Sequence, residues 1–255
     1  MTDQLTLRLD PPLPRLPAGL RPMLARPLPA PFDSAEHLFE PVWGGARALA
    51  LIGPADQPGT GAVVMVAEDG TTGPAPVELA GLAARVDARS AVLDGEIVVV
   101  DPAGRLDGEE LARRLRGEPG RPMSYLAFDL LNLDGRSLLN LALDRRRGLL
   151  RQVLRPGDEV VAVPAIAEEG RALFEAVTSQ GLHGIRARQR SSPYLPGIRS
   201  RLWRSVLVET GGKPAAAAAA AQERQGDPTI AGEELDRKER VLALIRRLPL
   251  DFGGD

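Results

Sequence analysis

The chain has 255 residues, of which 44% are hydrophobic, enough to build a sizeable core in one large domain or two small ones. The formal net charge of −2 at pH 7 is not that of a strongly basic nonspecific DNA-binding protein, so any contact with nucleic acid must be local. The chain contains no cysteine, which excludes disulfides, thiolate metal sites and thiol catalysis.

Apolar periodicity predicts clustered strands with helices between them. Residues 1–20 are an extended lead-in, because prolines interrupt any regular element there. The expected strands are residues 46–52, 62–67, 91–100, 124–131, 159–163, 184–188 and 202–208. The expected helices are residues 76–86, 109–115, 143–153 and 171–178. This order favours an α+β fold over a doubly wound parallel sheet.

The composition changes after Thr210. Residues 209–232 contain seven consecutive alanines among Gly and polar residues, and they are expected to be a linker. Residues 233–248 predict a charged helix with one apolar face, which could dock on the body or on a partner protein. Because the N-terminus lacks an apolar signal segment and no apolar run approaches about 20 residues, we expect a cytoplasmic protein without a membrane segment.

Short motifs follow one another in a fixed order. They are Pro22-Met23-Leu24-Ala25, Glu40-Pro41-Val42-Trp43-Gly44-Gly45-Ala46-Arg47, Leu93-Asp94-Gly95-Glu96, Phe128-Asp129-Leu130-Leu131, Leu143-Asp144-Arg145-Arg146-Arg147, and Ser192-Pro193-Tyr194-Leu195-Pro196-Gly197 before Trp203. Each is weak alone, but together over residues 21–208 they resemble the adenylation domain of bacterial ATP-dependent DNA ligases.

The resemblance implies a nucleotidyltransferase fold, with two antiparallel sheets and flanking helices around an ATP pocket. In that family a pocket lysine attacks the α-phosphate of ATP, and the AMP is passed to a DNA 5′-phosphate with the help of a divalent metal. An OB-fold domain normally follows. The 47 residues after Val208 are too few and of the wrong composition for one, so we expect no OB-fold domain here.

The nucleophile of the family pattern is missing. Where the family has Lys-x-Asp-Gly, this chain has Val42, Trp43, Gly44 and Gly45. Valine has no lone pair with which to attack phosphorus, so no catalytic residue is assigned. The chain's only lysines, at positions 213 and 238, lie in the tail.

Three further motifs of the family also depart from the pattern. The usual Ser-Arg is Ala67-Glu68, which replaces a phosphate-binding cation by an anion. The usual Glu-Gly-x-x-x-Lys corresponds to residues 183–188, which begin with His183 and end with Arg188, and the usual Trp-x-Lys-x-Lys begins at Trp203 but lacks both lysines. Binding of the implied cofactors, ATP and Mg²⁺, is therefore expected to be weak or absent.

Some nucleotide-binding positions of the family are retained. The candidates are Arg47, Glu96, Phe128 and Arg188. Each also has a structural explanation, since Phe128 lies in an apolar strand and the charged residues can pair with one another; for Arg47, Glu96 and Phe128 we favour an inherited scaffold role over ligand contact. No metal site is expected, because the chain has two histidines and no cysteine.

Residues 183–208 contain several arginines and no acidic residue. Besides Arg188, these candidates for a phosphate or DNA patch are Arg186, Arg190, Arg199, Arg201 and Arg204. They could hold phosphates through bidentate contacts, or they could be a solvated strand edge. Both interpretations stay open, and Tyr194 and Trp203 give thin support for base stacking.

Three hypotheses follow. The first, which we prefer, is a ligase-like pseudoenzyme that has lost lysine adenylation and nick sealing and acts as a binding or scaffold module in DNA repair or recombination. Its partners would be DNA ends or nicks, or a repair protein held by the C-terminal helix. The second is an active ATP-dependent DNA ligase or nucleotidyltransferase with a non-standard site. The third is a noncovalent nucleotide sensor that uses Phe128 and Glu96.

Overall fold

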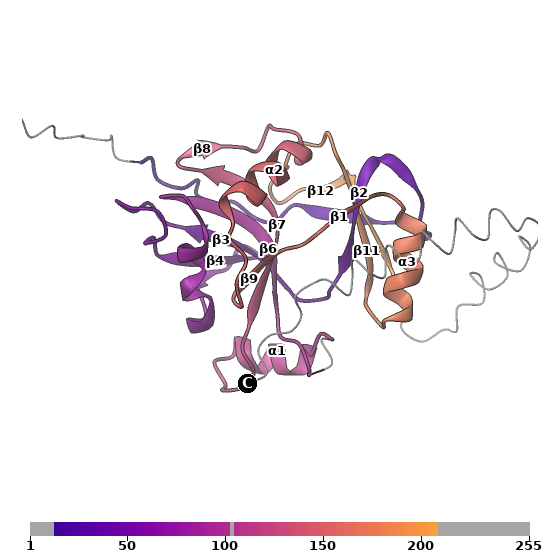
Figure 1. The fold of residues 1–255 in the computed structure, drawn as a ribbon, viewed down its shortest axis with the longest axis horizontal. Coiled ribbons are helices and arrows are strands. Elements are labelled where there is room, and N and C mark those ends of the chain that lie inside the picture. The colour runs from indigo at the N-terminus through magenta and orange to yellow at the C-terminus, as the bar shows by residue number, and fades with distance from the viewer. Residues whose placement is uncertain (1–12, 103–104, 209–255) are drawn as a thin grey trace, which may run out of the picture.

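The structure, a computed structural model, describes residues 13–102 and 105–208 (Figure 1). The expected linker at 209–232 and the expected helix at 233–248 lie outside the described residues, as do residues 1–12 of the lead-in. Within the described ranges, no helix is long and apolar enough to cross a membrane.

The strands form one five-stranded and one seven-stranded sheet, which stand side by side in Figure 1. The five-stranded sheet has the order β1 (Leu24–Pro27), β12 (Arg199–Leu207), β11 (Gly184–Gln189), β2 (Ser34–Val42) and β10 (Ile166–Glu168). The other has the order β5 (Thr72–Pro74), β4 (Val63–Ala67), β3 (Ala46–Ile52), β6 (Ala91–Val98), β7 (Ser124–Leu133) and β8 (Arg136–Ser137), with β9 (Val160–Ala162) also on β7. The expected α+β fold is confirmed; all pairs are antiparallel except β1–β12 and β7–β9.

The described residues form four helical segments. They are η1 (Val77–Arg85), α1 (Gly108–Leu115), α2 (Leu143–Val153) and α3 (Gly170–Ser179). α1 begins after Asp107, whose carboxylate accepts a hydrogen bond from the Glu110 amide and so caps the helix. α3 packs on β11 and β2, whereas α2 packs on β7 and spans toward the other sheet (Figure 1). The segment expected as a helix at 76–86 is a 3₁₀ helix rather than an α-helix.

α2 is fixed to β7 by a buried ion pair. Arg146 donates to both oxygens of Asp129, with Nε–Oδ1 and Nη2–Oδ2 distances of 2.9 and 2.8 Å, and both side chains are fully buried. Its Nη1 also donates to the carbonyls of Ser192 and Leu141. A bidentate pair in which every guanidinium nitrogen has an acceptor is the arrangement in which burial of two charges is tolerated. Two of the sequence motifs therefore meet in a structural contact.

β2 was not among the expected strands. Its inward end contains Glu40 and Pro41, a charge and a residue without an N–H, and both disfavour a strand in a sequence pattern. In the sheet, β10 pairs with β2 only as far as Phe39, which leaves one edge of β2 without a strand neighbour at Pro41. The other edge pairs with β11 from His37 to Val42. Pairing across the chain, rather than local propensity, makes this strand.

Candidate functional site

The retained positions of the nucleotide motifs come together between the two sheets. Arg47 lies on β3, Glu96 on β6, Phe128 on β7 and Arg188 on β11. The guanidinium groups of Arg188 and Arg47 lie 4.8 and 5.2 Å from the centroid of the Phe128 ring. A third guanidinium, that of Arg186, lies 5.8 Å from it. The aromatic ring thus has three cations around it, and only 1% of the residue is exposed.

Arg188 is the most enclosed of these cations. It is fully buried between two aromatic rings, 4.8 Å from the Phe128 centroid and 4.4 Å from that of Trp203. Among the described residues, none of its three side-chain nitrogens has a hydrogen-bond partner. Burial lowers the pKa of Arg188 to about 10, although the charge of Glu40 opposes the shift. The guanidinium is therefore still protonated at neutral pH.

Glu40 on β2 lies between two buried guanidinium groups. Its Oε1 accepts a hydrogen bond from Arg147 Nη1, and its Oε2 lies 3.2 Å from Arg188 Nε. Arg147 also donates to the backbone carbonyls of Phe128 and Val163 at 2.9 and 2.6 Å. One carboxylate that is 1% exposed thus faces two cations. Sequence reasoning missed this contact, although a glutamate flanked by apolar residues was a signal.

The other cations of the site have carboxylate partners. Arg47 Nη2 donates to Asp94 Oδ2 at 2.5 Å, and Arg186 donates to Glu96 Oε1 at 3.3 Å. Glu96 and Asp94 are 3% and 0% exposed, so both carboxylates are committed to arginines inside the protein. The arrangement is a self-paired network, in which the Leu93-Asp94-Gly95-Glu96 motif supplies the anions. Whether these residues bind a nucleotide stays a prediction.

The position at which the motifs predict the family nucleophile holds a buried aliphatic side chain. Val42 is 8% exposed at the end of β2, opposite Gly184 of β11. The next residue, Trp43, is 2% exposed and packs in the core formed by β2, β7, β11 and α3. Gly44 has a φ of +81°, and a Cβ placed there would lie 2.8 Å from the His183 ring. A side chain at position 44 therefore has neither the backbone conformation nor the space it needs.

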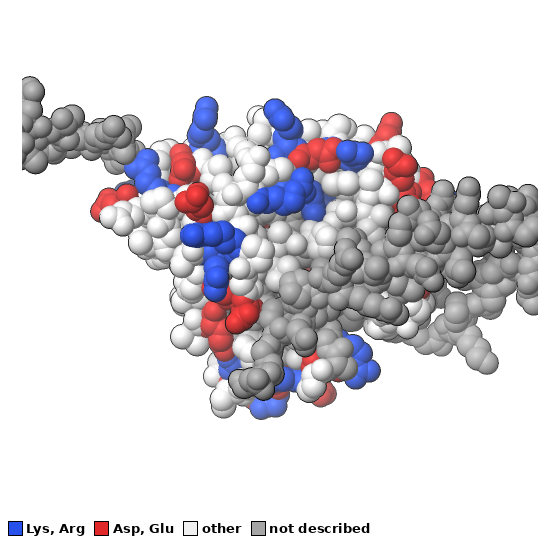
Figure 2. Space-filling view, in the orientation of Figure 1, with Lys and Arg blue, Asp and Glu red and all other residues white. Residues whose placement is uncertain are grey.

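The arginines proposed as a patch are distributed over different surroundings. Arg186 pairs with Glu96, and Arg190 Nε pairs with Asp144 Oδ2 at 2.8 Å. Arg199 and Arg201 are exposed on β12, and Arg204 is half-buried with its side chain on the other side of the sheet, as strand alternation requires. The face shown in Figure 2 has positive and negative side chains interspersed.

The two aromatic residues near these arginines are interior. Tyr194 and Trp203 are 2% and 0% exposed, and their rings meet edge to face at 5.5 Å. The indole Nε1 of Trp203 donates to Ser192 Oγ at 3.3 Å. Neither ring is available at the surface for stacking on a base. In the part of the chain that the structure describes, no cluster of three or more His, Asp or Glu residues could hold a metal ion.

Comparison with known proteins agrees with the resemblance seen in the motifs. The model of the ATP dependent DNA ligase domain matches residues 71–206. The multifunctional non-homologous end joining DNA repair protein LigD of Mycobacterium tuberculosis is 34% identical over 188 residues, which are 72% of this chain and 23% of that protein. A probable DNA ligase of Saccharopolyspora erythraea is 34% identical over 132 residues, 51% of this chain and 26% of that protein. The chain thus spans about a quarter of these curated relatives.

Two solved structures share the fold. A mycobacterial DNA ligase D complexed with ATP and MES superposes with a TM-score of 0.63 and 29% identity, over 75% of this chain and 61% of that chain. The ligase domain of M. tuberculosis LigD superposes with a TM-score of 0.61 and 30% identity, over 73% and 58%. Because the family model covers more than half of the chain and the same fold recurs in these relatives, the chain belongs to the family of the ATP-dependent DNA ligase domain.

Proposed function

We propose that this domain has lost lysine adenylation and nick sealing and acts as a noncatalytic DNA-binding or scaffold module in DNA repair. The observation that carries the proposal is Val42 at the position predicted for the nucleophile, beside buried arginines and carboxylates of the nucleotide motifs that pair with one another. Adenylation needs an amine at that position, and a valine cannot supply one.

ATP does not fit the residues as they are arranged. A base that stacked on Phe128 would have to displace Arg188, whose guanidinium lies 4.8 Å from that ring. Glu96 is already bound to Arg186, and the exposed Glu68 at the end of β4 stands where the family has a phosphate-binding arginine. The charged residues at the predicted nucleotide positions therefore pair with other residues of the protein, which supports a pseudoenzyme over a nucleotide sensor.

The test of lost activity is covalent labelling. The full chain is incubated with ATP labelled in the α-phosphate and Mg²⁺, beside an active ligase as the positive control. We expect no labelled protein, and an unchanged mass by intact-protein mass spectrometry. A covalent AMP adduct on any residue would overturn this part of the proposal. Calorimetric titration with ATP, ADP and AMP after Arg188 is replaced by alanine reports separately whether the ring of Phe128 can be reopened to a base.

DNA binding is supported by exposed arginines at the β1–β12 edge of the five-stranded sheet. Arg21, Arg26, Arg199 and Arg201 are exposed there, and within the described residues they make no ion pair. Arg26 and Arg199 hold the two strands together through backbone carbonyls, so the guanidinium groups are positioned along one edge. Unpaired, exposed arginines are suited to phosphates of a DNA backbone.

The DNA test compares two double variants of equal charge change. R199A/R201A removes edge arginines, and the control R113A/R116A removes two exposed arginines at the end of α1 that pair with Glu118. In fluorescence anisotropy with a nicked duplex, we expect only the first variant to weaken binding. The slope of log K against log salt should decrease by about 0.9 for each DNA phosphate that the protein no longer neutralises. Equal effects of both variants, or no DNA binding by the unmodified chain, would count against this surface.

A further inference from the structure

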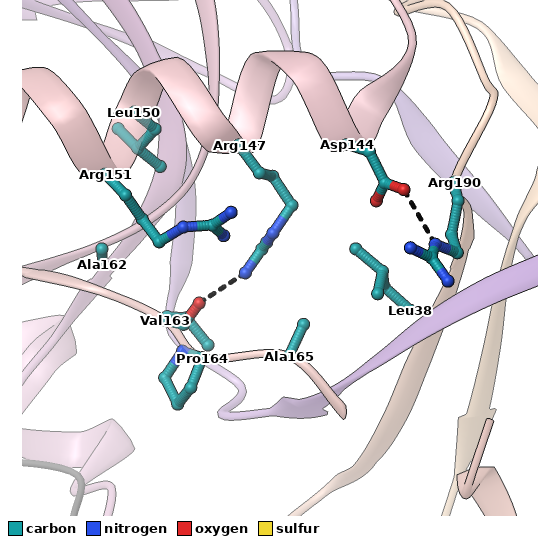
Figure 3. A pocket seen from close by; sticks show the side chains of 10 residues that line it. All are labelled: Leu38, Asp144, Arg147, Leu150, Arg151, Ala162, Val163, Pro164, Ala165 and Arg190. Carbon is teal, nitrogen blue, oxygen red and sulfur yellow. Dashed lines mark hydrogen bonds and ion pairs between the residues drawn. The ribbon is translucent and has the colours of Figure 1, made fainter. Parts of the chain in front are cut away.

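A pocket of about 550 Å³ opens beside α2 (Figure 3). It is formed by α2, by the segment from β9 to β10, by β2 and by the residue that follows β11. Its apolar lining consists of Leu38, Leu150, Ala162, Val163, Pro164 and Ala165, and its charged lining consists of Asp144, Arg147, Arg151 and Arg190. None of the four retained positions of the nucleotide motifs lines it, so it is a separate site.

Three arginines line the pocket: two lie on α2, and Arg190 follows the end of β11. Arg147 and Arg151 are four residues apart on α2, which places them on the same face one turn from each other. Figure 3 shows the guanidinium of Arg151 extending toward the Arg147 side chain, with the Arg190 guanidinium on the other side of the pocket. Two like charges from one helix therefore converge on a hollow with apolar walls, an arrangement that an anion between them would stabilise.

The free hydrogen-bond donors at this pocket belong to Arg151. Arg147 is 4% exposed, and both of its Nη atoms already have acceptors, so it contributes its charge to the pocket wall and no free donor. Arg151 is exposed and makes no ion pair in residues 13–102 and 105–208. Arg190 uses Nε for Asp144. A guanidinium without an anion at the mouth of a pocket is matched by a ligand that carries negative charge and several acceptor oxygens.

The charges define the ligand further. The pocket lining contains three arginines and one aspartate, a formal net charge of about +2, and the buried Glu40 offsets part of the charge of Arg147. A phosphomonoester has a charge of about −1.5 to −2 near neutral pH and three acceptor oxygens, whereas a carboxylate has one charge. Arginine forks match phosphate geometry. We infer that this pocket binds a phosphomonoester whose body, of about nucleotide size, lies on the apolar wall.

The experiment measures binding of AMP to the full chain by isothermal titration calorimetry. The variant R151A removes an exposed pocket arginine, and R145A removes an exposed arginine of the same helix that does not line the pocket. We expect R151A to weaken AMP binding by about tenfold, the effect of one charge-assisted hydrogen bond. R145A should bind AMP within about twofold of the unmodified chain, and adenosine, which lacks the phosphate, should not bind.

Further arms distinguish the source of the phosphate. A 5′-phosphorylated oligonucleotide that binds in an Arg151-dependent manner, when its 5′-hydroxyl counterpart does not, identifies a DNA end as the ligand. Arg151-dependent binding of AMP alone identifies a free nucleotide. The inference is overturned if no phosphate probe binds, if adenosine binds as well as AMP, or if R151A and R145A behave alike. These binding results do not depend on whether ATP labels the protein covalently. The labelling experiment therefore tests the proposed loss of adenylation separately from this inference.

Discussion

Replacing Glu40 by glutamine tests the buried charge network most directly. The substitution keeps the size of the side chain and removes the carboxylate that pairs with both Arg147 and Arg188, 3.2 Å from the Nε of the latter. Two buried guanidinium groups then remain without their anion. Breaking a buried ion pair by removing one partner costs about 3–5 kcal/mol, and we expect E40Q to lower the free energy of unfolding by this amount. For a domain of this size, Tm should fall by roughly 10 °C.

The assay is urea unfolding followed by tryptophan fluorescence. The chain has two tryptophans, Trp43 and Trp203, and both are buried, so their emission should report unfolding of the core. The matched variant is R188M, which leaves Glu40 paired with Arg147 alone and should cost much less than E40Q. The double variant E40Q/R188M should be more stable than E40Q, because it holds one buried cation without an anion instead of two. The reasoning is refuted if E40Q loses less than about 1 kcal/mol, or if the double variant is no more stable than E40Q.

The remaining predictions concern ionisation, backbone conformation and the lost nucleophile. Tyr125 and Tyr194 are the only tyrosines, and burial raises the pKa of both well above the usual 10; the folded state therefore keeps protons that the unfolded chain releases, and stability present below pH 10 should decrease as the pH rises further. Tyrosinate absorbance should stay flat until the protein unfolds, and reversible ionisation near pH 10 in the folded state would contradict this. G44A should cost about 1–2 kcal/mol for its left-handed backbone alone, with a further cost from the clash with His183 that disappears in an H183A background; equal costs in both backgrounds would exclude the clash. V42K should not acquire AMP from ATP, because the other phosphate-binding positions also differ, and labelling of that variant would show that they are dispensable.

The local elements were predictable because their signals are local. The expected strand at 46–52 and helix at 143–153 have the same bounds as β3 and α2, since a short apolar run bounded by glycines defines the first and apolar residues at helical spacing define the second. The helix type of η1 was not predicted, because a segment that follows a proline and has a central glycine can form either an α-helix or a 3₁₀ helix. β2 was missed because its charge and its proline are acceptable only beside the strands that it meets.

The sequence by itself determined the family and the α+β class, because motif order and residue identity do not depend on how the chain packs. That Val42 replaces the nucleophile stays a prediction from the motifs. Only the tertiary structure decided where the charges are neutralised. Glu40 meets an arginine 107 positions away, and Arg188 lies between rings from two different strands. Such contacts depend on how the sheets face each other across the core, and a buried charge takes whichever partner that packing brings within hydrogen-bond distance.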